Sequence, residues 1–291
     1  MRPGPVVFDL SGLLAGRGCA ATTTVELMQR IVEHYGADPA QVGEWFLPDH
    51  TGAPLVILVH GGFWRPVWRR DLEEPSAQDL AVHGFAVFNI DYRTYEHPWP
   101  TTLLDSAAAI DHAFAAARHH GVDTTRRAIC GHSAGGGLVA WATSRAALAE
   151  HLPGANPSAP SFDAVILHAP VVSWAQASHE HLGDGAVDTF MGGRPEDVPQ
   201  RYAASDPIGL VPDAAGRRLI LHGDTDTDVP LSQSLAYTHH LHSHDVVVEH
   251  LTRPGEGHYE ILDPDSPVSH VRREFLTEVL ITPRQLRADD R

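Results

Sequence analysis

Cysteine, basic residues and long apolar runs are all scarce in this chain of 291 residues. The two cysteines, Cys19 and Cys130, cannot form a disulfide framework, so a reducing cytoplasm is the expected compartment. Basic residues number 21 against 37 acidic ones, and the net charge of −16 argues against nucleic acid and anionic membranes as partners. No run reaches the roughly 20 apolar residues of a membrane-spanning helix. What remains is a globular chain whose 43% of apolar residues can build a sizeable core.

The N-terminal residues 1–20 resemble a secretory signal only weakly. Asp9 interrupts the apolar stretch, Arg2 is the one basic residue before it, and the cleavage signals are poor. We therefore expect a loose or appended segment there, with a secretory signal as the alternative. The remainder, 21–291, shows no internal repeat or low-complexity tract and is expected to form a single domain.

Short apolar stretches alternate with helical patterns along this remainder. The expected strands are 42–47, 55–59, 85–90, 126–130, 164–168, 217–223 and 246–251. The expected helices are 25–34, 72–83, 103–119 and 134–151, with a further helix that ends near 239–244. Strands that alternate with helices predict an α/β fold, in which a mostly parallel central sheet carries helices on both faces.

One serine lies at the centre of the pentapeptide Gly131-His132-Ser133-Ala134-Gly135. The pattern GxSxG arises by chance in many proteins, but here a buried strand precedes it and a helix follows. A serine on such a tight strand-to-helix turn is held in a strained backbone with its hydroxyl exposed. The flanking glycines let the strand and the helix pass close to each other. The context therefore indicates that Ser133 is a nucleophile.

A serine nucleophile needs a base and an orienting acid, and both types of residue follow at later strand ends. The expected strand 217–223 leads into three aspartates, Asp224, Asp226 and Asp228. The expected strand 246–251 leads into a glycine-rich loop that carries His258. Because parallel strands present their carboxyl ends at one edge, we expect Ser133, an aspartate and His258 to meet there.

The segment after the first buried strand is suited to stabilising an oxyanion. The strand 55–59 ends in His60-Gly61-Gly62-Phe63-Trp64, where glycines let the backbone approach a substrate. Acyl transfer passes through a tetrahedral oxyanion that needs fixed hydrogen-bond donors. We expect the N–H groups of Gly62, Phe63 and Ala134 to supply them. The alternative, that these glycines form only a turn, does not account for the four matching parts in order.

With these parts, the chain resembles the α/β-hydrolase superfamily, and within it the kynurenine formamidase-like and small carboxylesterase branch. The resemblance covers roughly residues 35–282 and rests on 60–64, Asp91-Tyr92-Arg93, 131–136, 222–230 and Gly257-His258. The family spacing His-Gly-x-x-Asp-x-x-Val-Pro falls on His222, Gly223, Asp226, Val229 and Pro230, which makes Asp226 the triad acid. Formamidases of this branch usually carry tyrosine where this chain has Phe63, so the substrate class stays open.

The resemblance implies a serine hydrolase that cleaves a small ester or amide through an acyl-enzyme. In it, His258 takes the proton from Ser133 and Asp226 holds the imidazole tautomer. No cofactor is expected, and the partner is a small-molecule substrate, with a homodimer left open. Two alternatives remain: a cyclase, acyltransferase or lyase on the same scaffold, and a binding protein that has lost catalysis.

Aromatic residues and one long connection are expected near the substrate. Candidate substrate contacts are Trp64, Trp68, Trp99, His132 and Trp174, although Trp64 serves equally well as a packing residue. The connection 173–207, which contains Trp174, is predicted to be a small lid. The alternative is a solvent-exposed insertion that does not touch substrate. Asp91-Tyr92-Arg93 is expected to hold the oxyanion loop by a buried ion pair or hydrogen bonds.

The 21 histidines raise the question of a metal site. His239, His240, His242 and His244 cluster near a helix end, where donor and cationic side chains are favoured without any metal. A structural zinc usually needs four well-spaced ligands, often including cysteines, and neither cysteine is close in the sequence. We therefore predict no metal.

Overall fold

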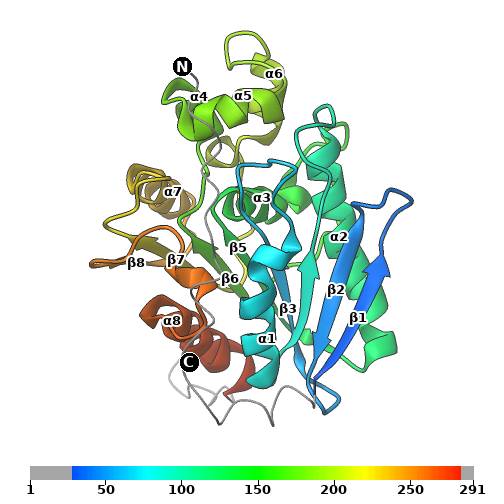
Figure 1. Cartoon of the computed structure of the whole chain (residues 1–291). Helices are drawn as coiled ribbons and strands as arrows, with labels where there is room; N and C mark the ends of the chain where they lie inside the picture. Colours follow the sequence, from blue (N-terminus) through cyan, green and yellow to red (C-terminus); the bar gives the residue numbers. More distant parts are fainter. Residues whose placement is uncertain (1–27, 283–291) are drawn as a thin grey trace, which may run out of the picture.

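The computed structural model describes residues 28–282, which contribute to one eight-stranded sheet of order β1-β2-β4-β3-β5-β6-β7-β8 (Figure 1). β1 pairs antiparallel with β2, and β2 antiparallel with β4, whereas every other neighbouring pair is parallel. The strands are β1 Gln29–His34, β2 Val42–Leu47, β3 Pro54–Val59, β4 Ala86–Ile90, β5 Asp123–His132, β6 Ala164–His168, β7 Arg217–Gly223 and β8 Val248–Arg253. The mostly parallel sheet expected from the alternating pattern is confirmed.

Helices cover both faces of this sheet, which is the α/β-hydrolase fold that the sequence predicted. α1 Glu74–Val82 and α8 Pro267–Leu276 pack on one face, and α2 Thr101–Ala117, α3 Ala134–Ala142 and α7 Ser232–Ser243 on the other. Three further helices are α4 Trp174–His179, α5 Ala186–Met191 and α6 Pro199–Ser205. The 3₁₀ helices are Arg70–Glu73, Arg118–His120, Arg145–Ala147, Leu182–Gly185, Pro207–Gly209 and Glu260–Leu262, and a π-helical turn spans Thr277–Ile281.

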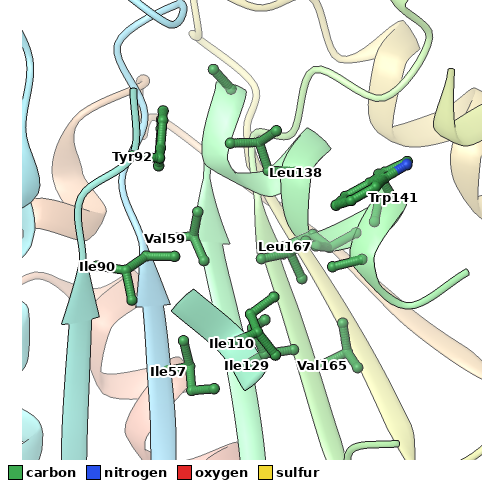
Figure 2. Packing of buried hydrophobic residues seen from close by; sticks show 14 of the residues in the cluster. Ile57, Val59, Ile90, Tyr92, Ile110, Ile129, Leu138, Trp141, Val165 and Leu167 are labelled. Atoms are coloured by element: carbon green, nitrogen blue, oxygen red, sulfur yellow. The ribbon is translucent and has the colours of Figure 1, made fainter. Parts of the chain in front are cut away.

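Three strands of the sheet, β3, β4 and β6, are buried along their whole length because helices cover both of their faces. Every residue of β3, β4 and β6 is buried, as their nearly continuous apolar runs predict for strands of a parallel sheet. Figure 2 shows Ile57, Ile129 and Val165 of three adjacent strands in the same buried cluster as Leu138 and Trp141 of α3. This packing fixes the position of the turn that joins β5 to α3.

The predicted helix over 25–34 is wrong. Residues 25–27 lie outside the described part of the chain, and Gln29–His34 form the edge strand β1. Its few apolar residues fit the period of a helix as well as that of a strand. The pairing with β2 makes this segment a strand. Glu33 also ties β1 to the sheet and to α2, because its carboxylate accepts hydrogen bonds from Trp45 Nε1 at 3.0 Å and His112 Nε2 at 2.9 Å.

The helix after Ser133 is shorter than predicted. It ends at Ala142 rather than near His151, and a 3₁₀ turn follows at Arg145–Ala147. Local bonds explain the end, because Thr143 Oγ1 donates to the Ala140 carbonyl and Ser144 N to the Trp141 carbonyl. The predicted loose segment 1–20, with Cys19, lies outside the described residues. Within 28–282, no helix is long and apolar enough to cross a membrane.

The connection 173–207 forms helices that pack at one end of the sheet. Figure 1 shows α4, α5 and α6 gathered there, beside the loop that follows β3. Asp206 begins the return to the sheet, and its two carboxylate oxygens accept the N–H groups of Trp174 and Ala175, each at 2.9 Å. These bonds satisfy the first turn of α4 from the far end of the connection.

Asp206→Asn is expected to change how stability depends on pH. Burial raises the pKa of Asp206 from 3.8 to about 6, even though the N–H groups of Ala175 and Trp174 act to lower it. Between pH 4 and 6 the folded protein therefore keeps a proton that the unfolded chain releases, so wild-type stability falls as pH rises. Relative to the variant, wild type should lose about 3 kcal/mol across this range.

Urea unfolding of both proteins at several pH values measures this effect. The difference between the two proteins isolates Asp206, because His132 and His168, whose pKa values burial lowers, titrate alike in both. If the difference in the free energy of unfolding between wild type and variant stays constant from pH 4 to 7, the raised pKa of Asp206 is contradicted.

Candidate active site

Ser133 occupies the turn between β5 and α3 in the strained conformation expected of a nucleophile. Its backbone has φ of 56° and ψ of −121°, a region that non-glycine residues rarely adopt. The turn is held by main-chain bonds, since Ser133 N donates to the His168 carbonyl at 2.8 Å and Val171 N donates to the Ser133 carbonyl at 3.1 Å. A Cβ added at Gly131 would lie 2.5 Å from the Gly135 carbonyl oxygen, so the strand and helix do pass closely.

Asp226 is the aspartate that contacts His258. The His258 Nδ1–H donates to Asp226 Oδ2 at 2.7 Å, while Asp226 Oδ1 accepts the N–H groups of Asp228 at 2.9 Å and Val229 at 2.8 Å. Asp224 instead accepts from Gly255 N, and Asp228 from the Tyr259 hydroxyl. Burial acts to raise the pKa of Asp226, but hydrogen bonds from His222, His258 and Val229 outweigh it and hold the pKa well below its usual value. Asp226 is therefore a carboxylate that can hold the His258 ring in one tautomer.

His132 connects the nucleophile turn to the loop that carries His258. Its Nε2–H donates to the His258 carbonyl at 2.9 Å, and the two ring centroids lie 4.7 Å apart. Because His132 precedes Ser133 directly, this contact brings His258 to the nucleophile turn. Among the hydrogen bonds of residues 28–282, none joins Ser133 Oγ to the His258 ring. Such bonds commonly tighten only when substrate binds.

The predicted oxyanion loop, residues 60–64, lies directly against Ser133. A Cβ added at Gly61 would come within 2.9 Å of Ser133 Cβ, so only a glycine allows this approach. The next residues form a tight turn in which Phe63 and Trp64 have positive φ values of 50° and 54°. Ala134 is the first residue of α3, where N–H groups have no partner within the helix. Gly61 and Ala134 thus flank Ser133, with Gly62 and Phe63 next in the same loop, and their role as oxyanion donors stays a prediction.

The side chains of Asp91 and Tyr92 hold this loop in place, as the sequence indicated. The Tyr92 hydroxyl donates to the His60 carbonyl at 2.8 Å, and its ring stacks on the His60 ring at 4.4 Å. Asp91 accepts both the N–H and the guanidinium of Arg70, each at 2.7 Å. Burial acts to raise the pKa of Asp91, but hydrogen bonds from His60 and Arg70 lower it below its usual value. The acid is thus charged, and it fixes both ends of the loop.

Two of the predicted substrate contacts lie inside the core. Trp64 and Trp174 are both 0% exposed. The Trp64 ring stacks on Phe190 at 4.2 Å and meets the edge of Trp174 at 5.9 Å. This placement supports the packing role for Trp64, in which the ring fastens the oxyanion loop to the helices of 173–207.

The other predicted contacts differ in exposure. Trp68 is 39% exposed and lies over Gly62, where an added Cβ would meet it at 2.4 Å. Trp99 is half-buried with the Arg201 guanidinium 5.4 Å from its ring centroid. His132 is buried and faces the His258 loop. Of these side chains, Trp68 is the one placed at the surface next to the oxyanion loop.

The connection 173–207 contacts the oxyanion loop at a second point. Arg65 Nη2 donates to the Gly183 carbonyl at 2.7 Å. The Phe63 ring lies so close to Gly183 that an added Cβ there would approach it to 2.7 Å. The connection therefore contacts the loop of residues 60–65, but both its role as a lid and the alternative of an insertion that does not touch substrate stay predictions.

His222 is a site residue whose role the sequence did not suggest. It is 0% exposed, its Nε2 lies 2.9 Å from the Val229 carbonyl and 3.3 Å from Asp226 Oδ2, and its Nδ1 lies 2.7 Å from Ser234 Oγ. Since Nε2 faces two acceptors it carries the proton, and His222 supplies a second donor to the acid. Its place in the His-Gly motif was the available signal, but a motif does not reveal which atom it contacts.

A protein-family model described as BD-FAE matches residues 45–241, more than half of the chain. The chain belongs to the BD-FAE family. The match begins in β2 and ends in α7, so it includes Ser133 and Asp226 but not His258. Among residues 28–282 of this family member, no group of three or more histidine, cysteine, aspartate or glutamate residues could hold a metal ion.

Curated relatives of this BD-FAE family member include esterases of Mycobacterium tuberculosis. Esterase LipC is 30% identical over 259 residues, which cover 84% of this chain and 64% of LipC. Esterase LipQ is 30% identical over 204 residues, which cover 67% of this chain and 48% of LipQ. The chain thus spans about half to two thirds of the length of these relatives.

Solved structures support the fold. A truncated form of a carbohydrate esterase from gut microbiota has a TM-score of 0.74 at 22% identity, with 87% of this chain and 97% of that chain covered. Esterase B from Lactobacillus rhamnosis, inhibited by a tributyrin phosphonate, has a TM-score of 0.73 at 21% identity, with 87% of each chain covered. At 21–22% identity, these matches show that the fold is shared and no more.

Proposed function

We propose that this protein is a serine hydrolase that cleaves small carboxylic esters. The observation that carries the proposal is the hydrogen bond of 2.7 Å from His258 to Asp226, next to a serine with a φ of 56° in the turn before α3. Curated relatives named as esterases and the BD-FAE family match support the same class. The related cleavage of amides, including aryl formamides, belongs to the same chemistry and is tested beside it.

The tautomer of His258 determines which of its nitrogens accepts and donates protons during the reaction. Because Nδ1–H donates to Asp226, Nε2 is the free base that accepts the Ser133 proton as Oγ attacks the ester carbonyl. The imidazolium then formed is stabilised by the Asp226 carboxylate and gives its proton to the leaving alcohol. Water, deprotonated at the same nitrogen, attacks the acyl-enzyme and releases the acid together with free Ser133.

The oxyanion of each tetrahedral intermediate is assigned to backbone N–H groups. Gly62 and Phe63 supply donors from the loop that touches Ser133, and Ala134 supplies one from the first turn of α3. Positive φ values at Phe63 and Trp64 hold this loop in one conformation before substrate arrives. A preorganised donor of this kind contributes roughly 3 kcal/mol to the transition state.

Access to the nucleophile is restricted. Ser133 is 1% exposed and His258 5% exposed, so Ser133 is buried rather than exposed as the sequence predicted, and we infer that side chains over it move when a substrate carbonyl binds. The contacts of Gly183 with Arg65 and Phe63 support the proposal that the connection 173–207 acts as a lid. We infer a preference for short acyl groups, because the buried Trp64 and Trp174 leave the loop side of the site filled.

The two substrate classes are separated by comparing kcat/KM for p-nitrophenyl acetate, p-nitrophenyl octanoate and N-formylkynurenine. We expect the acetate ester to be the best of the three, because Phe63 lacks the hydroxyl that tyrosine supplies in formamidases. Faster turnover of N-formylkynurenine would instead identify a formamidase. Absence of turnover on all three would contradict the proposed hydrolase.

A further inference from the structure

A small cavity lies directly behind the nucleophile turn, on the α1 and α8 face of the sheet. Its volume is about 10 Å³ as measured for the centre of a water-sized sphere, which is the space that one water molecule needs. Its lining is unusually polar for a position between a sheet and two helices. The lining residues are Leu58, Glu73, Cys130, Gly131, His132, Ile166, His168, Ile261 and Arg272.

Four lining side chains can ionise, and each is almost completely buried. Glu73, His132 and His168 are each 3% exposed, and Arg272 is 2% exposed. Several of their polar atoms have no hydrogen-bond partner among the described protein groups, namely His132 Nδ1, His168 Nδ1, Arg272 Nε and Arg272 Nη2. Buried polar atoms are rarely left in this state, because each unmet hydrogen bond costs about 1–3 kcal/mol.

The hydrogen bond to His258 fixes which nitrogen of His132 carries the proton. Burial holds the pKa of His132 well below its usual value, so the ring is neutral and has one N–H. Its Nε2 lies 2.9 Å from the His258 carbonyl oxygen, an atom that can only accept. The proton is therefore on Nε2, and Nδ1 is a bare acceptor on a ring that lines the cavity.

The Glu73 carboxyl group is a polar neighbour of this bare nitrogen and also lines the cavity. Its Oε1 lies 3.9 Å from His132 Nδ1, which is too far for a direct hydrogen bond. Two acceptors that face each other need a donor between them. Burial raises the pKa of Glu73, so a protonated carboxyl is the other group that could meet this need, but only if it moves closer to the ring.

Arg272 provides a cation with unused donors at the same place. Among residues 28–282, no carboxylate lies within 4.0 Å of its guanidinium, although charged groups this deeply buried normally have a partner. The next residue, Arg273, shows the contrast, because its Nη1 donates to Asp79 Oδ2 at 2.8 Å and to the Pro264 carbonyl at 2.8 Å. Arg272 Nε and Nη2 are thus available to a ligand that accepts hydrogen bonds.

We propose that one internal water molecule binds in this cavity and acts, with Glu73 and Arg272, as a positioning group for His258. The water oxygen accepts from Arg272, and its two hydrogens are donated to His132 Nδ1 and to the Glu73 carboxyl group. This arrangement gives His132 Nδ1 a donor and Arg272 an acceptor, whereas His168 Nδ1 keeps no partner among the described protein groups. The water keeps His132 in the tautomer whose Nε2–H holds the His258 main chain. This inference rests on the proposed function only in giving His258 a catalytic role.

The water itself is tested by a high-resolution crystal structure of the wild-type protein. We expect a density peak in the cavity within about 3.2 Å of His132 Nδ1 and of Arg272. A cavity without density would overturn the proposal. So would a Glu73 carboxyl moved to within direct hydrogen-bond distance of Nδ1, because that arrangement leaves no need for water.

The positioning role is tested with Arg272→Met and the matched control Arg273→Met on the same helix. We expect Arg272→Met to lower kcat by roughly tenfold to a hundredfold, because small displacements of catalytic groups cost this much. KM should stay nearly constant, since the altered side chain does not touch substrate. Arg273→Met removes the ion pair to Asp79 and should leave kcat near the wild-type value. Equal losses in both variants would indicate general damage to α8 and overturn the role.

Nitrogen-15 NMR of the His132 ring gives a readout that needs no activity. Wild type should show a bare Nδ1 and a protonated Nε2, whereas Arg272→Met should show exchange between tautomers or protonation at Nδ1. An unchanged ring in the variant would overturn the positioning role. If Ser133→Ala retains activity, the proposed function fails, but the water density and ring tautomer still decide the present inference.

Discussion

Ser133→Ala is expected to abolish ester hydrolysis, with a loss in kcat of roughly a millionfold. The reason is chemical, since alanine has no oxygen to attack the carbonyl, and the remaining backbone donors give only weak catalysis above water. The fold should survive, because the bonds of Ser133 to His168 and Val171 use main-chain atoms that alanine retains. Steady-state kinetics on p-nitrophenyl acetate, with circular dichroism for the fold, measures both effects.

Ser144→Ala provides the matched control for this variant. Ser144 is also 1% exposed and follows the same helix, but its hydroxyl has no hydrogen-bond partner among the described groups. Its removal should therefore leave kcat close to the wild-type value. Hydrolysis that persists in Ser133→Ala, or an equal loss in both variants, would contradict the assignment of the nucleophile.

Asp226→Asn is expected to lower kcat by about 10⁴-fold. The N–H groups of Asp228 and Val229 both point at Oδ1, so the asparagine oxygen will take this position. The amide NH₂ then faces His258 Nδ1 in place of the acceptor Oδ2. This arrangement favours the wrong tautomer of His258, with the proton on Nε2, where it cannot accept the proton of Ser133.

Asp224→Asn tests whether Asp224, rather than Asp226, is the acid that orients His258. Asp224 is exposed and accepts from Gly255 N at 2.7 Å, with no contact to His258. Its variant should keep kcat within about threefold of wild type, as surface changes usually do. A large loss in Asp224→Asn together with a small one in Asp226→Asn would assign the acid to Asp224 instead.

The sequence predicted the centre of the fold well because burial on both faces leaves a clear pattern there. The first and last residues of β6 and of β7 were predicted correctly, since each strand has an apolar run bounded by polar residues. β1 was missed because a half-exposed edge strand has only a few apolar residues, which fit a helical period equally well. What made it a strand is its pairing with β2, a tertiary contact that the segment itself does not encode.

The parts of the candidate site that the sequence could predict are those that depend on local backbone geometry. The strained turn at Ser133 and the loop at Gly62 and Phe63 both follow from glycine and serine patterns. The surroundings depend on packing between distant segments, so Trp64 and Trp174 were predicted as substrate contacts although both are buried.

Glu73 and Arg272 were overlooked for a related reason. Each stands in a run of charged residues, Arg69–Glu74 and Arg272–Glu274, that is typical of an exposed surface. Their neighbours Glu74 and Arg273 do form ion pairs with other elements, to Arg30 and Asp79 respectively. Only the three-dimensional structure distinguishes the member of each pair that turns inward.

The central claim, that Ser133 is a nucleophile activated by His258 and Asp226, is tested most directly by covalent labelling. The wild-type protein is treated with a fluorophosphonate, and the adduct is located by intact mass and peptide mass spectrometry. We expect one adduct per chain on Ser133, none in Ser133→Ala and slow labelling in Asp226→Asn. Fast labelling without ester turnover would favour a non-hydrolytic enzyme on the same scaffold. No labelling, or an adduct on another residue, would contradict the account.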